Sequence, residues 1–216
     1  MSNPLMLVAI WITAEVAAVA WLLSAIGRDR RMMQWLAKPT ASAIFVALGL
    51  MRADFGSAFD MWMVTGLILG MAGDVLLIEQ KTFRWGLLTF LAGHAAYIVA
   101  FDRAQSWSSW SLLVLVPLVI AAVAVTRWLW PHASSMRGAV LAYIVVISLM
   151  AWGGIALSLS GALPISVGIG ASLFFLSDLA VARHRFVKAA FLNRAIGLPA
   201  YYAGQMLLAL AIGAVG

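Results

Sequence analysis

The chain contains no cysteine. This absence excludes disulfide bonds, thiolate nucleophiles and cysteine-ligated metal sites. Charged residues are also scarce, since they make up 10% of the 216 residues, whereas hydrophobic residues make up 64%. Soluble domains carry about 25% charged residues, so the composition predicts an integral membrane protein with no room for a sizeable soluble domain.

The hydrophobic residues form long runs, which favours membrane-spanning helices over short alternating strands. Each run approaches the ~20 residues that a helix needs to cross a ~30 Å hydrocarbon core. We predict an all-α integral membrane protein, a bundle of about eight transmembrane helices forming a single domain over residues 1–216. The expected spans are residues 4–26, 36–53, 61–79, 86–102, 110–130, 138–159, 165–182 and 195–214.

The basic residues gather in alternate loops, which is the orientation signal of a membrane protein and requires no nucleic-acid partner. Of the 14 Lys and Arg, only Arg52 and Arg103 fall in even-numbered loops. We therefore predict that the odd loops are cytoplasmic and both termini outside, in a bacterial-type inner (plasma) membrane. The residues in or beside the odd loops are Arg28, Arg30, Arg31, Lys38, Lys81, Arg84, Arg127, Arg137, Arg183, Arg185, Lys188 and Arg194.

A weak internal repeat occurs at an offset of 104 residues. It favours two parallel halves of four helices each, related by an axis along the membrane normal. Chance similarity between apolar segments is the alternative interpretation. The matched pairs are Gly66 with Gly170, Asp74 with Asp178, Lys81 with Arg185, and Tyr97 with Tyr201.

Two neighbouring apolar runs each contain one polar residue deep inside, Asp74 in the first and His94 in the second. A charged group at the centre of a membrane helix costs roughly 2.5–3.5 kcal/mol on insertion scales, so it usually faces the bundle interior and has a function. Gly66 and Gly70 precede Asp74 at four-residue intervals, so the three residues share one helix face. The two glycines predict a close approach by a neighbouring helix.

Further polar residues are expected at the same depth as this pair. Tyr97 shares a helix face with His94, and Asp178 lies about as far from its loop as Asp74 does. Such a layer is typical of a reactive site inside a bundle, although hydrogen bonds that only stabilise the bundle are the alternative for each member. The remaining members are Tyr201, Tyr202, Gln205 and Lys38, the last as either a ligand contact or an interfacial anchor.

Two further points follow from the ionisable residues. Glu15 lies in the middle of the first span and needs a partner or a proton, and its role stays open. Asp74, His94 and Asp178 are a conceivable metal set, but one histidine without a Glu-x-x-His pairing is a poor basis for it. No motif indicates nucleotide binding, a zinc protease or a Ser-His-Asp triad. We expect no metal and no cofactor.

At these positions the sequence resembles the YhhN family of membrane proteins, which includes the TMEM86 lysoplasmalogenases. The resemblance implies a multi-span protein of about eight helices. It also implies hydrolysis of the vinyl ether bond of a lysoplasmalogen, giving a fatty aldehyde and glycerophosphoethanolamine or glycerophosphocholine. The features that carry it are Lys38-Pro39, Gly73-Asp74, the FLAGH string ending at His94 with Tyr97, Ser177-Asp178, and Tyr201-Tyr202 with Gln205.

Vinyl ether hydrolysis needs a carboxylic acid that protonates carbon and a carboxylate that supports the cation and activates water, an electronic problem that glycosidases share. Asp74 and Asp178 supply this pair, with the assignment of roles left open. His94 would orient water or shuttle the proton, while Lys38, Tyr97, Tyr201, Tyr202 and Gln205 would bind and position the substrate. The expected partner is a lysophospholipid in the bilayer, and the oligomeric state stays open.

Other functions fit the same residues. A non-enzymatic lipid-binding or proton-coupled transport protein would also place carboxylates inside a bundle. A metal-dependent hydrolase of amides or esters is a further alternative.

Overall fold

The structure is a computed structural model that describes residues 4–214. Within these residues it contains eight α-helices and no strand, which confirms the all-helical prediction. The helices are α1 (Pro4–Gly27), α2 (Arg31–Arg52), α3 (Ala58–Leu76), α4 (Phe83–Ala104), α5 (Leu112–Ala133), α6 (Arg137–Leu159), α7 (Ile165–Ala182) and α8 (Phe191–Leu210). Short helical turns lie between them: η1 (Gln80–Thr82), η2 (Trp107–Ser109), η3 (Ser134–Met136) and η4 (Arg183–Val187).

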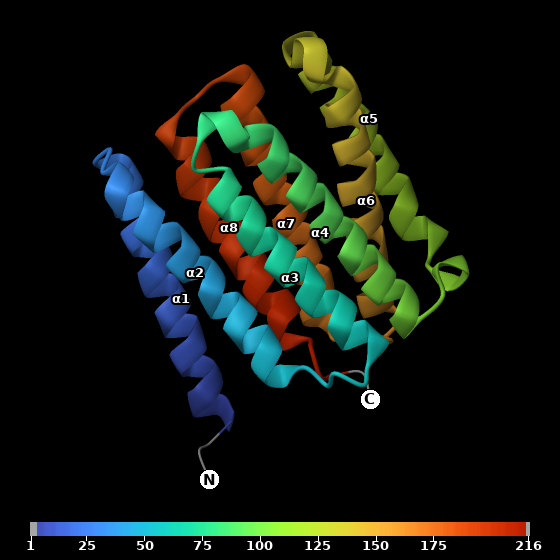
Figure 1. The fold of residues 1–216 in the computed structure, drawn as a ribbon. Helices are drawn as coiled ribbons and strands as arrows, with labels where there is room; N and C mark the ends of the chain where they lie inside the picture. The colour runs from blue at the N-terminus through green and yellow to red at the C-terminus, as the bar shows by residue number, and fades with distance from the viewer. Residues whose placement is uncertain (1–3, 215–216) are drawn as a thin grey trace.

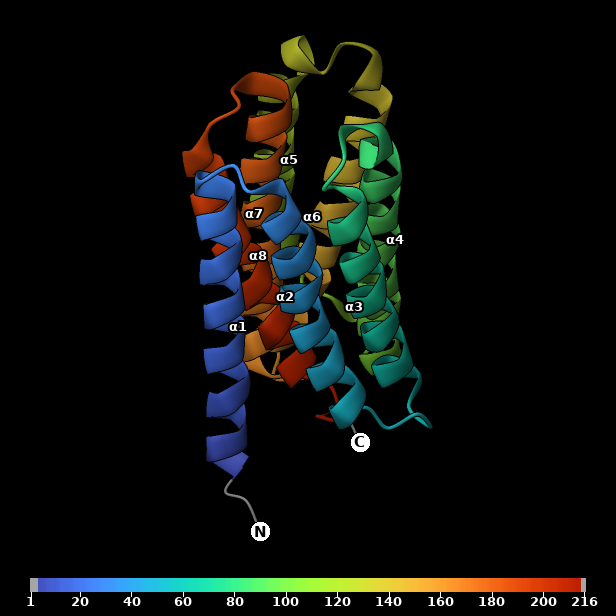
Figure 2. The same cartoon turned by 60° about the vertical axis from the view of Figure 1, so that its left-hand side comes forward.

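Successive helices run in alternate directions, so every second connection lies at the same end of the bundle (Figures 1 and 2). One end holds the connections after α1, α3, α5 and α7, which are the odd loops of the sequence prediction. We call it the basic end, because the clustered Lys and Arg residues lie in or beside these connections. The described chain begins and ends at the opposite end.

Glycine sets the closest helix contacts. A Cβ atom at Gly93 of α4 would lie 3.3 Å from the carbonyl oxygen of Gly66 on α3. A Cβ atom at Gly170 of α7 would lie 2.9 Å from the carbonyl oxygen of Gly204 on α8. Backbones this close exclude side chains, which confirms the close approach predicted at Gly66. The α3–α4 and α7–α8 hairpins are accordingly the most extensively packed helix pairs.

The outer helices have fewer neighbours. Helix α1 packs on α2 and α8, whereas α5 packs on α6 and on the turn η4. Helix α2 lies between α1 and α3 and also contacts α8. The bundle interior is thus built where α2, α3 and α8 meet on one side and where α4, α6 and α7 meet on the other.

Most helices begin or end a few residues away from the expected spans, and the ends of α3 and α8 have local causes. Helix α3 ends at Leu76, not at 79, because the Thr82 hydroxyl donates to the Leu76 carbonyl at 2.6 Å and satisfies the end of the helix. Helix α8 covers 191–210, not 195–214. Its end is followed by Gly213 with a φ of +76°, a left-handed conformation that terminates helices.

Five stretches are long and apolar enough to cross a membrane, and the one at Leu112–Leu159 contains both α5 and α6. Helices α2 and α8 are not among them. These two helices carry Lys38 and Gln205, and such polar residues lower the hydropathy. The number of eight membrane crossings therefore stays a prediction.

We expect Gly66→Ala to destabilise the protein by about 1–3 kcal/mol, as overpacking does. The added Cβ would lie 2.5 Å from the ring of Tyr97, which is rigid and fully buried. Gly138→Ala is the matched control, since a Cβ at Gly138 meets nothing within 4 Å. Thermal unfolding in detergent measures both. Equal midpoints for the two variants would contradict the proposed packing of α3 on α4.

Candidate active site

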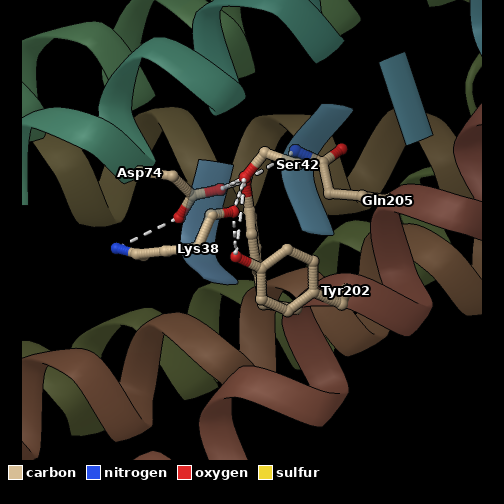
Figure 3. Close-up of polar contacts among 6 residues, drawn as sticks. Lys38, Ser42, Asp74, Tyr202 and Gln205 are labelled. Carbon is tan, nitrogen blue, oxygen red and sulfur yellow. Dashed lines mark hydrogen bonds and ion pairs between the residues drawn. The ribbon is translucent and has the colours of Figure 1, made fainter. Parts of the chain in front are cut away.

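Asp74 is the centre of the first polar cluster. Its carboxyl group is buried near the end of α3, with 2% of the residue exposed. Oδ1 lies 3.3 Å from the Lys38 ammonium nitrogen, while Oδ2 accepts hydrogen bonds from Ser42 Oγ at 2.7 Å and from the Tyr201 hydroxyl at 2.8 Å. Figure 3 shows Lys38 and Ser42 of α2 directed at this carboxyl group. All three partners are donors, so the surroundings suit a carboxylate.

A chain of hydrogen bonds leads to Asp74 from α4. The Tyr97 hydroxyl donates to Gln205 Oε1 at 2.7 Å, and Gln205 Nε2 donates to the Tyr201 oxygen at 3.2 Å. Tyr201 in turn donates to Asp74. Gly70 makes this possible, because a Cβ there would lie 2.5 Å from Gln205 Nε2. This series of hydrogen bonds fixes the direction in which the Tyr97 and Tyr201 hydroxyl groups point.

Tyr202 is held more loosely in the same cluster. Its hydroxyl lies 3.5 Å from Ser42 Oγ and 3.4 Å from the backbone oxygen of Lys38 (Figure 3). Ser42 Oγ also lies 3.0 Å from that oxygen. Because a serine hydroxyl has one proton, Ser42 donates either to Asp74 or to the Lys38 backbone oxygen at any one time. The Tyr202 hydroxyl lies within reach of both Ser42 and that backbone oxygen.

His94 and Asp178 form a second cluster with Tyr143. His94 Nδ1 lies 2.5 Å from the Phe90 carbonyl oxygen, and Nε2 lies 3.2 Å from Asp178 Oδ2. Tyr143 donates to the same Oδ2 at 3.0 Å. The His94 ring is enclosed by Phe174, with ring centroids 4.5 Å apart.

The tautomer of His94 decides which atoms meet in the His94–Asp178 contact. The Phe90 carbonyl can only accept, so Nδ1 carries a hydrogen, and Nε2 of a neutral ring then has only a lone pair. The contact lacks the alignment of a full hydrogen bond. Facing lone pairs at this distance repel each other, so the contact is suited to passing a proton between the ring and the carboxyl group.

Both aspartates line a single cavity of about 250 Å³. Lys38, Tyr143 and Tyr201 also reach its surface, whereas His94, Tyr97, Tyr202 and Gln205 stand behind the lining residues. Most of the wall is apolar, including Leu22, Leu77, Leu87, Phe90, Leu129, Val140, Ile144 and Ile147. We call the polar part at the basic end the rim; its residues are Gln34, Gln80, His184, Arg185, Asn193 and Arg194.

The predicted site residues therefore lie in two clusters that share a cavity, not in one continuous layer. The first gathers Lys38, Asp74, Tyr97, Tyr201, Tyr202 and Gln205, and the second pairs His94 with Asp178. Among residues 4–214, no three His, Cys, Asp or Glu side chains converge as a metal-binding group. Asp74 belongs to a different cluster from His94 and Asp178, so these three do not form the conceivable metal set.

Sequence reasoning missed Ser42 and Tyr143. Ser42 follows Lys38 by four residues, so the two share one helix face, and that spacing was a usable signal. Tyr143 is one of four tyrosines and lies inside the sixth predicted span. Nothing in the sequence indicated that it faces Asp178, because that contact joins α6 to α7 through the fold.

Glu15 in α1 is 4% exposed, and neither of its carboxyl oxygens has a hydrogen-bond partner among the described residues. Of the two options raised by the sequence, a partner or a proton, the surroundings favour a proton.

The chain matches the sequence model of the YhhN family over residues 33–212. It belongs to the YhhN family. All motifs that carried the resemblance lie inside the matched range. No solved structure matches this YhhN-family chain.

Named relatives agree with this assignment. The chain is 32% identical to "Lysoplasmalogenase TMEM86A" of Bos taurus over 181 residues, 81% of this chain and 67% of the relative. It is 32% identical to the human protein of the same name over 183 residues, with the same coverage. It is 25% identical to "Uncharacterized membrane protein YhhN" of Escherichia coli O157:H7 over 203 residues, 92% of this chain and 97% of the relative. Together with its apolar helices, this makes the chain an integral membrane protein.

We expect Glu15→Leu to raise the free energy of unfolding by about 1–3 kcal/mol, because it removes a buried polar group without a partner. Glu15→Gln is the control, since the amide is equally unpartnered and gains nothing. Thermal midpoints in detergent compare them. A lower midpoint for Glu15→Leu than for the parent would show that the carboxyl group is bonded after all.

Proposed function

We propose that this chain hydrolyses the vinyl ether bond of lysoplasmalogens, releasing a fatty aldehyde and glycerophosphoethanolamine or glycerophosphocholine. The observation that carries the proposal is the pair of differently supported carboxyl groups on one cavity. Asp74 is surrounded by donors, whereas Asp178 faces His94 Nε2 at 3.2 Å. The names of the TMEM86A relatives support the same substrate class.

The reaction begins with proton transfer to the β-carbon of the vinyl ether. The double bond supplies the electron pair for the new C–H bond, which leaves an oxocarbenium ion at the adjacent carbon. Water adds to that carbon and loses a proton, giving a hemiacetal. The hemiacetal then breaks its bond to the glycerol oxygen, which takes a proton and leaves as the alcohol while the aldehyde forms. One water molecule is consumed and no oxidant is needed.

The contacts support one assignment of the two roles that the sequence left open. Asp178 and His94 form the proton donor, because Asp178 reaches the cavity and His94 Nε2 lies 3.2 Å from its carboxyl group, close enough to pass a proton to it. Asp74 is the carboxylate that stabilises the oxocarbenium ion and accepts a proton from water. Lys38, Ser42 and Tyr201 keep it ionised and oriented; Lys38 is then a partner of Asp74 and not of the lipid phosphate.

The alkenyl chain would lie against the apolar wall, with the headgroup toward the rim. We further propose that the eight helices form one transmembrane domain in a bacterial-type inner membrane, with the basic end facing the cytoplasm. The clustering of Lys and Arg at that end supports this orientation.

Asp74→Asn and Asp178→Asn should each lower aldehyde release from a lysoplasmenyl lipid by about 10²-fold or more, because each removes one of the two required carboxyl groups. Purified protein in detergent is assayed for aldehyde, with and without chelator. Asp102→Asn is the matched control and should keep full activity. Asp102 is half-buried near the opposite end of α4, where it accepts a hydrogen bond from the Trp107 amide at 3.0 Å.

Full release by either folded Asn variant would refute the two-carboxyl mechanism. Loss of release with chelator would favour a metal-dependent hydrolase. No release by folded wild-type protein from any vinyl ether lipid would favour lipid binding or transport.

His94→Gln tests the proposed proton donor. We expect kcat to fall by about 10²-fold, because glutamine cannot pass a proton to Asp178. The pH dependence of kcat should also change shape, since the variant lacks one ionisable group of the proposed donor. A lower kcat with an unaltered pH profile would show that His94 only supports packing beside Phe174.

A further inference from the structure

In the described part of the chain, the rim of the cavity contains positively charged side chains and no carboxyl group. Its cationic side chains are Arg185 and Arg194, with His184 beside them, and its other members are amides. Among all described residues that line the cavity, the only carboxyl groups are Asp74 and Asp178, which belong to the two clusters. The rim therefore attracts an anion and offers amide hydrogen bonds around it.

Several cations near the rim already have partners. Arg31 is paired with Glu79, and this hydrogen bond holds the pKa of the Glu79 carboxyl below its ordinary value. Arg183 donates to Asn193 at 2.5 Å. These contacts use charges at the basic end to fasten helices to one another.

Arg185 is also engaged. Its guanidinium donates to Gln80 at 2.6 Å and lies 4.2 Å from the centre of the Phe83 ring. It thereby ties η4 to the start of α4.

Arg194 is different. It is half-buried on α8 and lines the cavity, yet it makes no hydrogen bond or ion pair through its side chain with any residue from 4 to 214. Asp29 influences it electrostatically but lies beyond ion-pair distance. A half-buried guanidinium with five unused N–H groups is a prepared site for an anion.

The position of Arg194 suits one part of the proposed substrate. It precedes Tyr201 by seven residues, two turns of α8, so both side chains lie on one face about 10 Å apart along the axis. Tyr201 donates to Asp74. In a lysoplasmalogen the short glycerol linker separates the vinyl ether from the phosphate, a span of the same order.

We propose that Arg194 binds the phosphodiester of a single-chain phospholipid at the rim of the cavity. Its planar guanidinium bonds two phosphate oxygens at once. The start of α8 adds the positive end of the helix dipole, since Arg194 is the fourth residue of that helix. The identity of the lipid rests on the proposed function, whereas the phosphate contact does not.

The test uses two saturated ether lipids that the reaction cannot cleave: hexadecyl-glycerophosphocholine, and hexadecyl-glycerol, which lacks the phosphate. Equilibrium binding to purified protein in detergent gives a dissociation constant for each. We expect the wild type to prefer the phosphate-bearing lipid by about tenfold or more, from one bidentate charged contact. Arg194→Gln should abolish this preference, and Arg194→Lys should reduce it by about threefold or more, because an ammonium group cannot bond in the same bidentate way.

Arg127→Gln is the matched control and should keep the whole preference. Arg127 is an exposed arginine of α5 that does not line the cavity. An undiminished preference in folded Arg194→Gln, or in Arg194→Lys if the Gln variant does not fold, would overturn the proposal.

Two competitors identify the source of the phosphate. Glycerophosphocholine should displace the phosphate-bearing lipid at lower concentration than inorganic phosphate does. Equal displacement by both would overturn the assignment to a phosphodiester headgroup. Binding that depends on Arg194, without aldehyde release from a vinyl ether lipid, would sustain this site and refute the hydrolase. Aldehyde release with binding that does not depend on Arg194 would sustain the hydrolase and refute this site.

Discussion

The buried carboxylate of Asp74 is the constraint on which the rest of the bundle depends. An ion taken out of water is costly unless it is paired and fully hydrogen-bonded, and removing one partner of such a group typically costs 3–5 kcal/mol. Asp74 on α3 is satisfied by Lys38 and Ser42 from α2 and by Tyr201 from α8. Helices α2, α3 and α8 must therefore meet at Asp74, so the contacts of this one carboxyl group constrain their relative positions.

Glycine allows the helices to satisfy that constraint. Gly70 leaves room for Gln205, which holds Tyr201 toward Asp74, and Gly66 leaves room for the Tyr97 ring at the start of the same hydrogen-bond chain. On the other wall of the cavity, the contact between His94 and Asp178 imposes a comparable requirement on α4 and α7. The two walls differ chemically because three donors surround the Asp74 carboxyl group, whereas Asp178 faces an imidazole ring and one tyrosine hydroxyl.

Much of this organisation was predictable because polar residues in apolar runs are costly. Asp74 and Asp178 were identified for that reason, and eight helices followed from the run lengths. The sequence could not separate the two clusters, since depth along a helix does not tell which neighbour a side chain faces. Tyr143 and the early end of α3 both depend on contacts that only the folded chain creates. The four-plus-four repeat stays a prediction. Its paired residues Asp74 and Asp178 have different partners, so the repeat does not extend to the contacts of the two carboxyl groups.

The proposed mechanism delivers a proton from the enzyme to the β-carbon of the vinyl ether, and the origin of the hydrogen on that carbon tests it directly. Turnover of a lysoplasmenyl lipid in heavy water, followed by mass spectrometry of the aldehyde after rapid reduction to the alcohol, measures it. Protonation of the vinyl ether predicts one solvent deuterium on the carbon next to the carbonyl carbon. Aldehyde without that deuterium would contradict the account, because the double bond would then have been opened by another route.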